Sequence, residues 1–349
     1  MRAHATVTFE AAKPGLVLPE AAPYTGRLHI RPIGIPAVVR REHPASYQMI
    51  TKAIAGAFPE AAPGWHKGTA GAILIVGGSE GLTGAPHLAA RAALRAGGGL
   101  ISVAAPHGLC RDIKADCPDI MTRALGPAGN VRWSPALLEE LLPFLRQCGA
   151  MALGPGIGRE PETAAFVQAL LMCPSRPSAV VDADALHALA MHPEALSSLR
   201  ACDVLTPHPG EAATLLHTTP ALVQADRFAA LAGLRRLAPS VWILKGAGTL
   251  IGTEGQPVTI APYAEPNLAV GGSGDVLSGC LGTLMAQTAA HPSEGCESSS
   301  FLAACMGVHL HARAGRLLRE AFPQRGNSAT DIAEMLPRAR IREAAGDGT

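Results

Sequence analysis

A glycine-rich turn that ends in an aspartate carries the clearest chemical signal in this sequence. It reads Gly-Gly-Ser-Gly-Asp at residues 271–275 and precedes an apolar helical pattern. The first N–H groups of a helix have no partner within the helix, so this turn can bind phosphate and stabilise negative charge on a transferred phosphoryl group. Asp275 can then accept or orient a hydroxyl proton. The simpler alternative makes Asp275 only a helix N-cap.

Standard nucleotide-binding fingerprints do not describe this chain. The turn at 271–275 lacks the lysine and the spacing of a P-loop, and the glycine-rich stretch 77–81 lacks the G-x-G-x-x-G spacing of a Rossmann motif. A different kind of phosphate site is therefore expected.

Three further polar turns follow apolar runs. Lys-Gly-Ala-Gly-Thr at 245–249 can hold phosphate or ribose oxygens, or it can be an ordinary hairpin. His208 stands between two prolines that fix its direction, so we predict that it contacts a ligand. Asp182 and Asp184 end a strand and can bind Mg²⁺ directly or through water, although Asp184 is equally plausible as a helix N-cap.

Short apolar runs alternate with helical patterns and must position these turns. Strands are predicted at 72–76, 100–103, 151–153, 179–181, 203–205 and 241–244, and helices at 84–96, 185–190, 274–289 and 298–319. Strands that are apolar throughout are covered on both faces, as in a parallel sheet. The pattern predicts an α/β fold with three α/β/α layers and a mostly parallel central sheet. Ligands bind beyond the carboxyl ends of such strands, where the polar turns fall.

Composition excludes several classes of function. A net charge of +1 and 4% aromatic residues argue against a nucleic-acid partner. No uncharged apolar run reaches membrane-spanning length, so we expect no membrane contact. Eight cysteines occur without a C-x-x-C pair, which favours reduced thiols and a cytoplasmic location.

Taken together, the motifs resemble those of the ADP-dependent NAD(P)H-hydrate dehydratases. The resemblance covers about residues 45 to 340 and rests on 67–68, 77–86, 154–158, 182–186, 205–211, 244–249 and 271–275. It implies a ribokinase-like fold and repair of the S epimer of hydrated NADH or NADPH. ADP, or ATP in some relatives, would phosphorylate the added hydroxyl, and elimination of phosphate would restore the dihydronicotinamide.

The same resemblance assigns residues and partners. NAD(P)H hydrate would contact Ala85, Gly156, His208 and Asp275, and Asp275 would activate its hydroxyl. ADP would contact Lys245, Gly246, Ala247, Gly248, Thr249 and Gly274. Mg²⁺ is the implied cofactor, and a homo-oligomer, possibly a tetramer, is the implied assembly. Residues 265–267 depart from the sequence usual in the family, which affects the expected nucleotide contacts nearby.

Residues 1–42 resemble the C-terminal end of a second family, the NAD(P)H-hydrate epimerases. The similarity rests on a strand-like run at 5–9 and on the stretches 13–15 and 33–36. We therefore predict an epimerase remnant at 1–42, a dehydratase domain at 43–340 and a tail at 341–349. The body of the epimerase would be a separate or fused partner.

Two alternatives use the same glycine-rich turn. A ribokinase-fold kinase of a small alcohol, such as a vitamin precursor, would release a stable phosphorylated product. That alternative is disfavoured because 77–86 and 207–211 occur together in this chain. A non-catalytic nucleotide-binding regulator would not need the intact Asp275.

Overall fold

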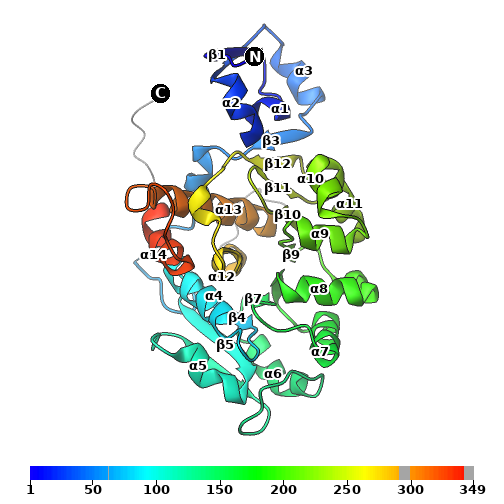
Figure 1. Cartoon of the computed structure of the whole chain (residues 1–349), viewed down its shortest axis with the longest axis vertical. Coiled ribbons are helices and arrows are strands. Elements are labelled where there is room, and N and C mark those ends of the chain that lie inside the picture. The colour runs from blue at the N-terminus through cyan, green and yellow to red at the C-terminus, as the bar shows by residue number, and fades with distance from the viewer. Residues whose placement is uncertain (62, 291–298, 342–349) are drawn as a thin grey trace.

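A computed structural model of the chain describes residues 1–61, 63–290 and 299–341 (Figure 1). The predicted tail falls, apart from residue 341, outside the described residues. Cys296 is also outside them, and the described cysteines form no disulfide with one another. Within the described ranges no helix combines the length and the apolar character needed to cross a membrane.

The described residues contain a central sheet of ten strands. These are β3 (Tyr47–Met49), β4 (Ala72–Val76), β5 (Leu100–Pro106), β6 (Met121–Leu125), β7 (Ala150–Leu153), β8 (Ser178–Val181), β9 (Val204–Leu205), β10 (Val241–Leu244), β11 (Thr249–Gly252) and β12 (Val258–Ala261). Their order is β3-β12-β11-β10-β9-β8-β7-β4-β5-β6. Strands β4 to β10 pair in parallel, and β11 runs antiparallel to both of its neighbours. The predicted three-layer α/β fold with a mostly parallel sheet is confirmed.

Helices cover both faces of this sheet (Figure 1). They are α4 (Gly84–Arg95), α5 (Cys110–Lys114), α6 (Leu137–Leu145), α7 (Pro161–Met172), α8 (Asp184–Met191), α9 (Pro209–Leu215), α10 (Pro220–Ala225), α11 (Arg227–Leu237), α12 (Ser273–Ala290), α13 (Ser299–Leu317) and α14 (Ala329–Ala339). Short 3-10 helices are η1 (Pro19–Ala21), η2 (Lys52–Ala57), η3 (His107–Leu109), η4 (Pro193–Ser198) and η5 (Pro266–Leu268).

Alternation along β4 explains why this strand is apolar at every position. Ile73 and Ile75 pack into the core shared with α4, α12, α13 and α14, whereas Leu74 and Val76 pack into the core shared with α6 to α9 and α11. All four side chains are fully buried. Successive side chains point to opposite faces of a sheet, so a strand covered on both faces has no polar side.

Helix α12 lies close to its neighbours because it carries small residues. A Cβ added at Gly279 would lie 1.8 Å from the carbonyl oxygen of Ala89 in α4, and one added at Gly282 would lie 2.1 Å from Ile73 in β4. A side chain at Gly279 would require the helix to move, because the obstacle is backbone, whereas one at Gly282 would displace the buried Ile73 side chain. This packing fixes the N-terminus of α12, and with it Asp275, against the sheet.

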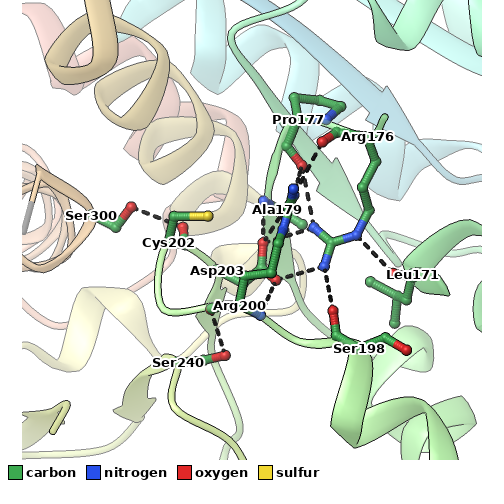
Figure 2. Close-up of polar contacts among 10 residues, drawn as sticks. All are labelled: Leu171, Arg176, Pro177, Ala179, Ser198, Arg200, Cys202, Asp203, Ser240 and Ser300. Carbon is green, nitrogen blue, oxygen red and sulfur yellow. Dashed lines mark hydrogen bonds and ion pairs between the residues drawn. The ribbon is translucent and has the colours of Figure 1, made fainter. Parts of the chain in front are cut away.

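A buried ion pair links β8 and β9 at the amino ends of these two strands (Figure 2). Arg176 precedes β8 and Asp203 precedes β9, and their side chains are 1% and 0% exposed. The Arg176 Nη1 and Nη2 atoms donate to Asp203 Oδ1 and Oδ2 at 2.8 and 2.7 Å. Asp203 also accepts from the N–H groups of Ala179 and Arg200 at 2.9 and 2.8 Å. The pair therefore links the amino ends of neighbouring strands, away from the carboxyl ends where the polar turns lie.

The N-terminal residues form a separate two-stranded sheet. Strand β1 (Ala5–Phe9), as predicted, pairs in parallel with β2 (Arg27–Arg31). The short helices α1 (Pro14–Val17) and α2 (Ala22–Thr25) lie between these strands in the chain, and α3 (Ala37–Glu42) follows them. Helix α1 begins at Pro14, a first helical position that tolerates proline. From β3 onwards the chain belongs to the ten-stranded sheet.

Candidate active site

The predicted polar turns meet at the carboxyl edge of the sheet. Lys245 follows β10, Asp182 follows β8, and Asp275 lies in the first turn of α12. Lys245 Nζ donates to Asp182 Oδ1 at 2.8 Å, and Ser278 Oγ of α12 donates to Asp182 Oδ2 at 2.5 Å. Asp182 thus joins two strand ends to the helix that carries Asp275.

This Lys245–Asp182 pair stays charged although it is buried. Burial alone raises the pKa of Asp182, but the positive charge of Lys245 and the hydrogen bonds from Lys245 and Ser278 outweigh it and lower that pKa. Burial alone lowers the pKa of Lys245, and the charges of Asp182 and Glu211 overcome this and raise it. A fixed ammonium group therefore lies at the start of α12: a Cβ added at Gly274 would be 3.5 Å from Lys245 Nζ.

Asp275 lies inside the first turn of α12 and does not cap this helix. Helix α12 begins at Ser273, so Asp275 is its third residue and the N-cap alternative is wrong. Burial, and then the negative charge of Asp182, raise the pKa of Asp275 to about 7. Within the described chain its carboxylate has no hydrogen-bond partner in the structure, so it can take a proton from a bound hydroxyl near neutral pH.

His208 has a capping role in addition to its exposure at the site. Its Nδ1 accepts from the N–H groups of Gly210 and Glu211 at 3.0 and 3.3 Å, while the Glu211 carboxylate accepts from the His208 N–H at 2.8 Å. This reciprocal capping box starts α9. Because Nδ1 is an acceptor, the ring proton lies on Nε2, which a ligand can reach.

A cavity of about 870 Å³ opens beside Lys245, within the size range of small-molecule sites. It includes these residues of the predicted set: His208, Lys245, Gly246, Ala247, Thr249 and Gly274. Gly248 does not line it, because that residue lies under Pro19, with an added Cβ only 2.8 Å from the proline ring. The turn at 245–249 also joins antiparallel β10 and β11, so it is both a hairpin and a cavity wall.

Ala85 and Gly156 come together outside that cavity. A Cβ added at Gly156 would lie 3.0 Å from the Ala85 Cβ, and Ser79 Oγ donates to the Gly156 carbonyl at 2.9 Å. A Cβ added at the neighbouring Gly154 would lie 1.9 Å from the carbonyl oxygen of Asp182. The turns after β4, β7 and β8 are therefore in contact with one another, and Asp182 connects them to the cavity side.

Comparison with known proteins decides the family. Residues 73–338 match the sequence profile of the NAD(P)H-hydrate dehydratases. The chain belongs to the NAD(P)H-hydrate dehydratase family. It is 41% identical over 335 residues to the bifunctional NAD(P)H-hydrate repair enzyme of Moorella thermoacetica, a match that covers 95% of this chain and 61% of that protein. The chain thus spans about three fifths of that curated relative.

Solved structures support the fold of this dehydratase-family chain. A ribokinase-like superfamily protein of Enterococcus faecalis has a TM-score of 0.70 at 21% identity, over 84% of this chain and 95% of that one. The ADP/ATP-dependent NAD(P)H-hydrate dehydratase of Bacillus subtilis, co-crystallised with ATP and Mg²⁺, has a TM-score of 0.64 at 22% identity, over 83% and 96%. The predicted ribokinase-like fold is confirmed.

Asp182 and Asp184 do not form an open pair for Mg²⁺ in this member of the dehydratase family. The Asp182 oxygens accept from Lys245 and Ser278, and those of Asp184 accept from Arg159 at 2.6 Å and from a backbone N–H at 3.2 Å. Direct ligation would break these bonds. The described residues hold no metal-ligating cluster of three or more His, Cys, Asp or Glu.

The alternative assignment of Asp184 as a helix N-cap is wrong. Ala183 is the N-cap of α8, with φ +51°, and Asp184 is the first helical residue. Its carboxylate instead joins the loop after β7 through Arg159 and the Gly158 N–H. Asp184 therefore holds two strand-end turns together.

Several cavity residues of this dehydratase-family chain carry no local sequence signal. Tyr263, Leu268, Val308 and His311 line the cavity from the loop after β12, from η5 and from α13. Glu265, from the stretch 265–267 that the sequence did single out, lines it too. Burial lowers the pKa of His311 to about 4, so its ring is neutral, and its Nε2 lies 3.1 Å from Ser273 Oγ. This contact steadies the first residue of α12. The apolar pattern of α13 does not indicate which of its histidines faces the cavity.

Proposed function

We propose that this chain dehydrates (6S)-NAD(P)H hydrate with ADP as phosphoryl donor, giving NAD(P)H, AMP and phosphate. One observation carries the proposal: the carboxylate of Asp275, with a pKa raised to about 7, lies in the first turn of a helix beside the ammonium group of Lys245. Lys245, Ser273 and Gly274 line the cavity, and Asp275 follows them in α12 without being a lining residue. A proton acceptor thereby lies next to a site for developing phosphate charge. Membership of the family supplies the substrate class.

The proposed first step is phosphoryl transfer. Asp275 takes the proton of the ring hydroxyl as the hydroxyl oxygen bonds to the β-phosphorus of ADP, and the bond from that phosphorus to the bridging oxygen breaks to release AMP. Charge that builds on the transferred group is stabilised by Lys245 and by the free N–H groups at the start of α12. Mg²⁺ bound to the nucleotide would neutralise phosphate charge during this transfer.

Elimination follows from the chemistry of the phosphorylated ring. The ring nitrogen donates its electron pair as the C–O bond to phosphate breaks, and loss of a proton from the adjacent ring carbon restores the dihydronicotinamide. Hydroxide is a poor leaving group and phosphate a good one, so the phosphoryl group is what makes dehydration possible. Ala85, Gly156 and His208 are the proposed contacts of the hydrate, and 245–249 with Gly274 those of ADP.

The pH dependence of turnover should report on Asp275. Its carboxyl must be ionised to accept the hydroxyl proton, and burial places its pKa at about 7. We expect kcat to fall about tenfold for each pH unit below about 7 and to level off above it. Initial rates from pH 5 to 9 at saturating substrates measure this.

A second carboxyl titrates in the same range and needs its own control. Burial raises the pKa of Glu211 to about 7 as well. Glu211→Gln should leave the acidic limb of kcat in place if Asp275 causes it. A kcat that does not change between pH 5 and 8 in the wild-type enzyme would exclude the assigned proton acceptor.

We further propose that residues 1–42 end an epimerase-like domain, that residues 43–340 form the dehydratase domain, and that the assembly is homo-oligomeric. The support is that the sequence relatives are bifunctional repair enzymes longer than this chain, and that the parallel pair β1–β2 carries the exposed apolar side chains Val7, Phe9 and Ile30. Light scattering of the purified chain, alone and with an NAD(P)H-hydrate epimerase domain, tests the first and the third of these statements. A monomeric chain that does not bind the epimerase domain would contradict them.

The direct test of the activity uses hydrated NADH, Mg²⁺ and ADP or ATP. We expect the absorbance of reduced nicotinamide to recover for the S epimer and not for the R epimer. No recovery with either nucleotide would overturn the dehydratase assignment. A stable phosphorylated product would favour the small-alcohol kinase instead.

A further inference from the structure

The turn at 245–249 has few hydrogen bonds among its own residues to fix its backbone conformation. Gly246 and Gly248 have φ values of +143° and +64°, which other residues rarely adopt. Its internal bond runs from Thr249 Oγ1 to the Gly246 carbonyl at 2.8 Å, and the Gly248 N–H donates to Tyr263 at 2.9 Å. Most of its carbonyl groups therefore need partners from elsewhere.

Arg227, the first residue of α11, supplies them. Its Nη1 atom donates to the carbonyls of Ala247 and Gly248, the second at 3.1 Å, and its Nη2 atom donates to those of Leu244 and Lys245 at 3.0 and 3.2 Å. All four N–H bonds of the two terminal nitrogens are thus used, three on the turn and one on Leu244, the strand residue just before it. The Nε atom is buried and has no partner among the described residues.

The guanidinium group acts from behind the turn. Arg227 does not line the cavity at Lys245, whereas Lys245, Ala247 and Gly246 do. A Cβ added at Gly246 would lie 3.1 Å from Arg227 Nη2, so this glycine rests on the guanidinium plane. The carbonyl oxygens of the turn point toward the Arg227 guanidinium group and away from the cavity, so their negative dipole ends do not repel an anionic ligand. The guanidinium group also adds positive charge near that ligand.

Residues 18–20 of the N-terminal segment lie against the turn at 245–249 and near Arg227. Leu18 and Pro19 contact the turn at Gly248, and the negative charge of Glu20 favours the protonated form of Arg227. Burial itself works in the opposite direction and lowers the pKa of this arginine. The guanidinium group is therefore held between the N-terminal segment and the nucleotide turn.

We infer that Arg227 is a positioning residue that sets the shape and charge of the ADP-binding turn without touching the nucleotide. This rests on the proposed function only in naming ADP as the ligand of that turn. The arrangement requires a planar group with several fixed donors. Lysine offers a point charge in place of a fork, so it cannot span the four carbonyls.

The test compares Arg227→Lys with a matched control on the same helix. Arg235 also donates to a carbonyl, that of Thr253 at 2.5 Å, but lies beyond the other end of β11. Titration of each protein with Mg²⁺–ADP by calorimetry should show Kd raised about tenfold or more in Arg227→Lys and unchanged in Arg235→Lys. In turnover assays the same variant should raise KM for ADP while kcat stays within about threefold.

The outcomes separate this inference from the proposed function. An Arg227→Lys variant that binds ADP as tightly as the wild type overturns the inference, as does a variant that lowers kcat alone. If Arg227→Lys fails to fold, Arg227→Gln gives the same comparison. ADP titration needs no turnover, so a wild-type protein that binds ADP but leaves hydrated NADH unchanged would refute the activity and still decide the role of Arg227.

Discussion

Replacing Asp275 by asparagine should lower kcat for dehydration by about a hundred- to ten-thousand-fold, the usual contribution of a general base. Asparagine keeps the size of the side chain and removes the proton acceptor. Affinity for ADP should change little, because the proposed phosphate contacts are Lys245 and the helix N-terminus and not Asp275. Steady-state kinetics together with ADP titration measure both quantities.

The same substitution should not weaken the fold, and this separates catalysis from stability. Burial raises the pKa of Asp275 to about 7 from its ordinary value near 4, so the folded protein holds the proton more tightly than the unfolded chain does. The cost of ionising the buried carboxyl grows as the pH rises above the unfolded-state pKa and is complete above about 7. The neutral amide of the Asp275→Asn variant avoids this cost, so its thermal unfolding at pH 8 should occur no lower than in the wild type.

A matched control isolates the position from the chemistry. Asp112 lies in the first turn of α5, is exposed, and takes no part in the site. Asp112→Asn should leave kcat and KM unchanged. If Asp275→Asn kept kcat within about threefold of the wild type, Asp275 would not be the proton acceptor.

Replacing Asp203 by alanine should lower the free energy of unfolding by about 3–5 kcal/mol, because it leaves the buried guanidinium of Arg176 without its counter-ion. The backbone N–H groups of Ala179 and Arg200 lose their acceptor at the same time. Urea unfolding followed by circular dichroism measures the change. A loss below about 1 kcal/mol would mean that water enters and solvates the site.

A double variant shows how much of that loss comes from the unpaired charge. Arg176→Met combined with Asp203→Leu removes both charges and fills part of the volume, so it should be more stable than Asp203→Ala. Because the pair lies at the amino ends of β8 and β9, the KM for ADP in folded Asp203→Ala should remain near the wild-type value. A double variant no more stable than Asp203→Ala would contradict the charge argument.

The sequence predicts the fold and the gathering of the polar turns for one reason. Apolar runs covered on both faces imply parallel strands, and the carboxyl ends of parallel strands share an edge. Asp182, His208 and Lys245 each follow a predicted strand, so their meeting can be foreseen. The ion pair between Lys245 and Asp182 cannot be foreseen in the same way. The two residues are 63 positions apart, and their contact depends on the order of the strands in the sheet.

Residues that act through the backbone escape pattern analysis. Arg227 looks like an ordinary charged residue at a helix start, and its four carbonyl partners lie at the end of β10 and in the turn that follows it, about 20 residues later. His311 reads as one polar position in an apolar helix, and its contact with Ser273 depends on how α12 and α13 pack. The start of α8 is hard to predict for a local reason. Ala183 has a positive φ, a conformation that an alanine in the sequence does not lead one to expect.

The most direct test of the central claim counts products in a single reaction. Hydrated NADH, ADP and Mg²⁺ are incubated with the enzyme, and NADH, AMP and inorganic phosphate are quantified together as the reaction proceeds. We predict that the three appear in equal amounts, with NADH formed only when ADP is consumed. AMP released together with a stable phosphorylated hydrate, without NADH or free phosphate, would contradict the account and make the protein a kinase.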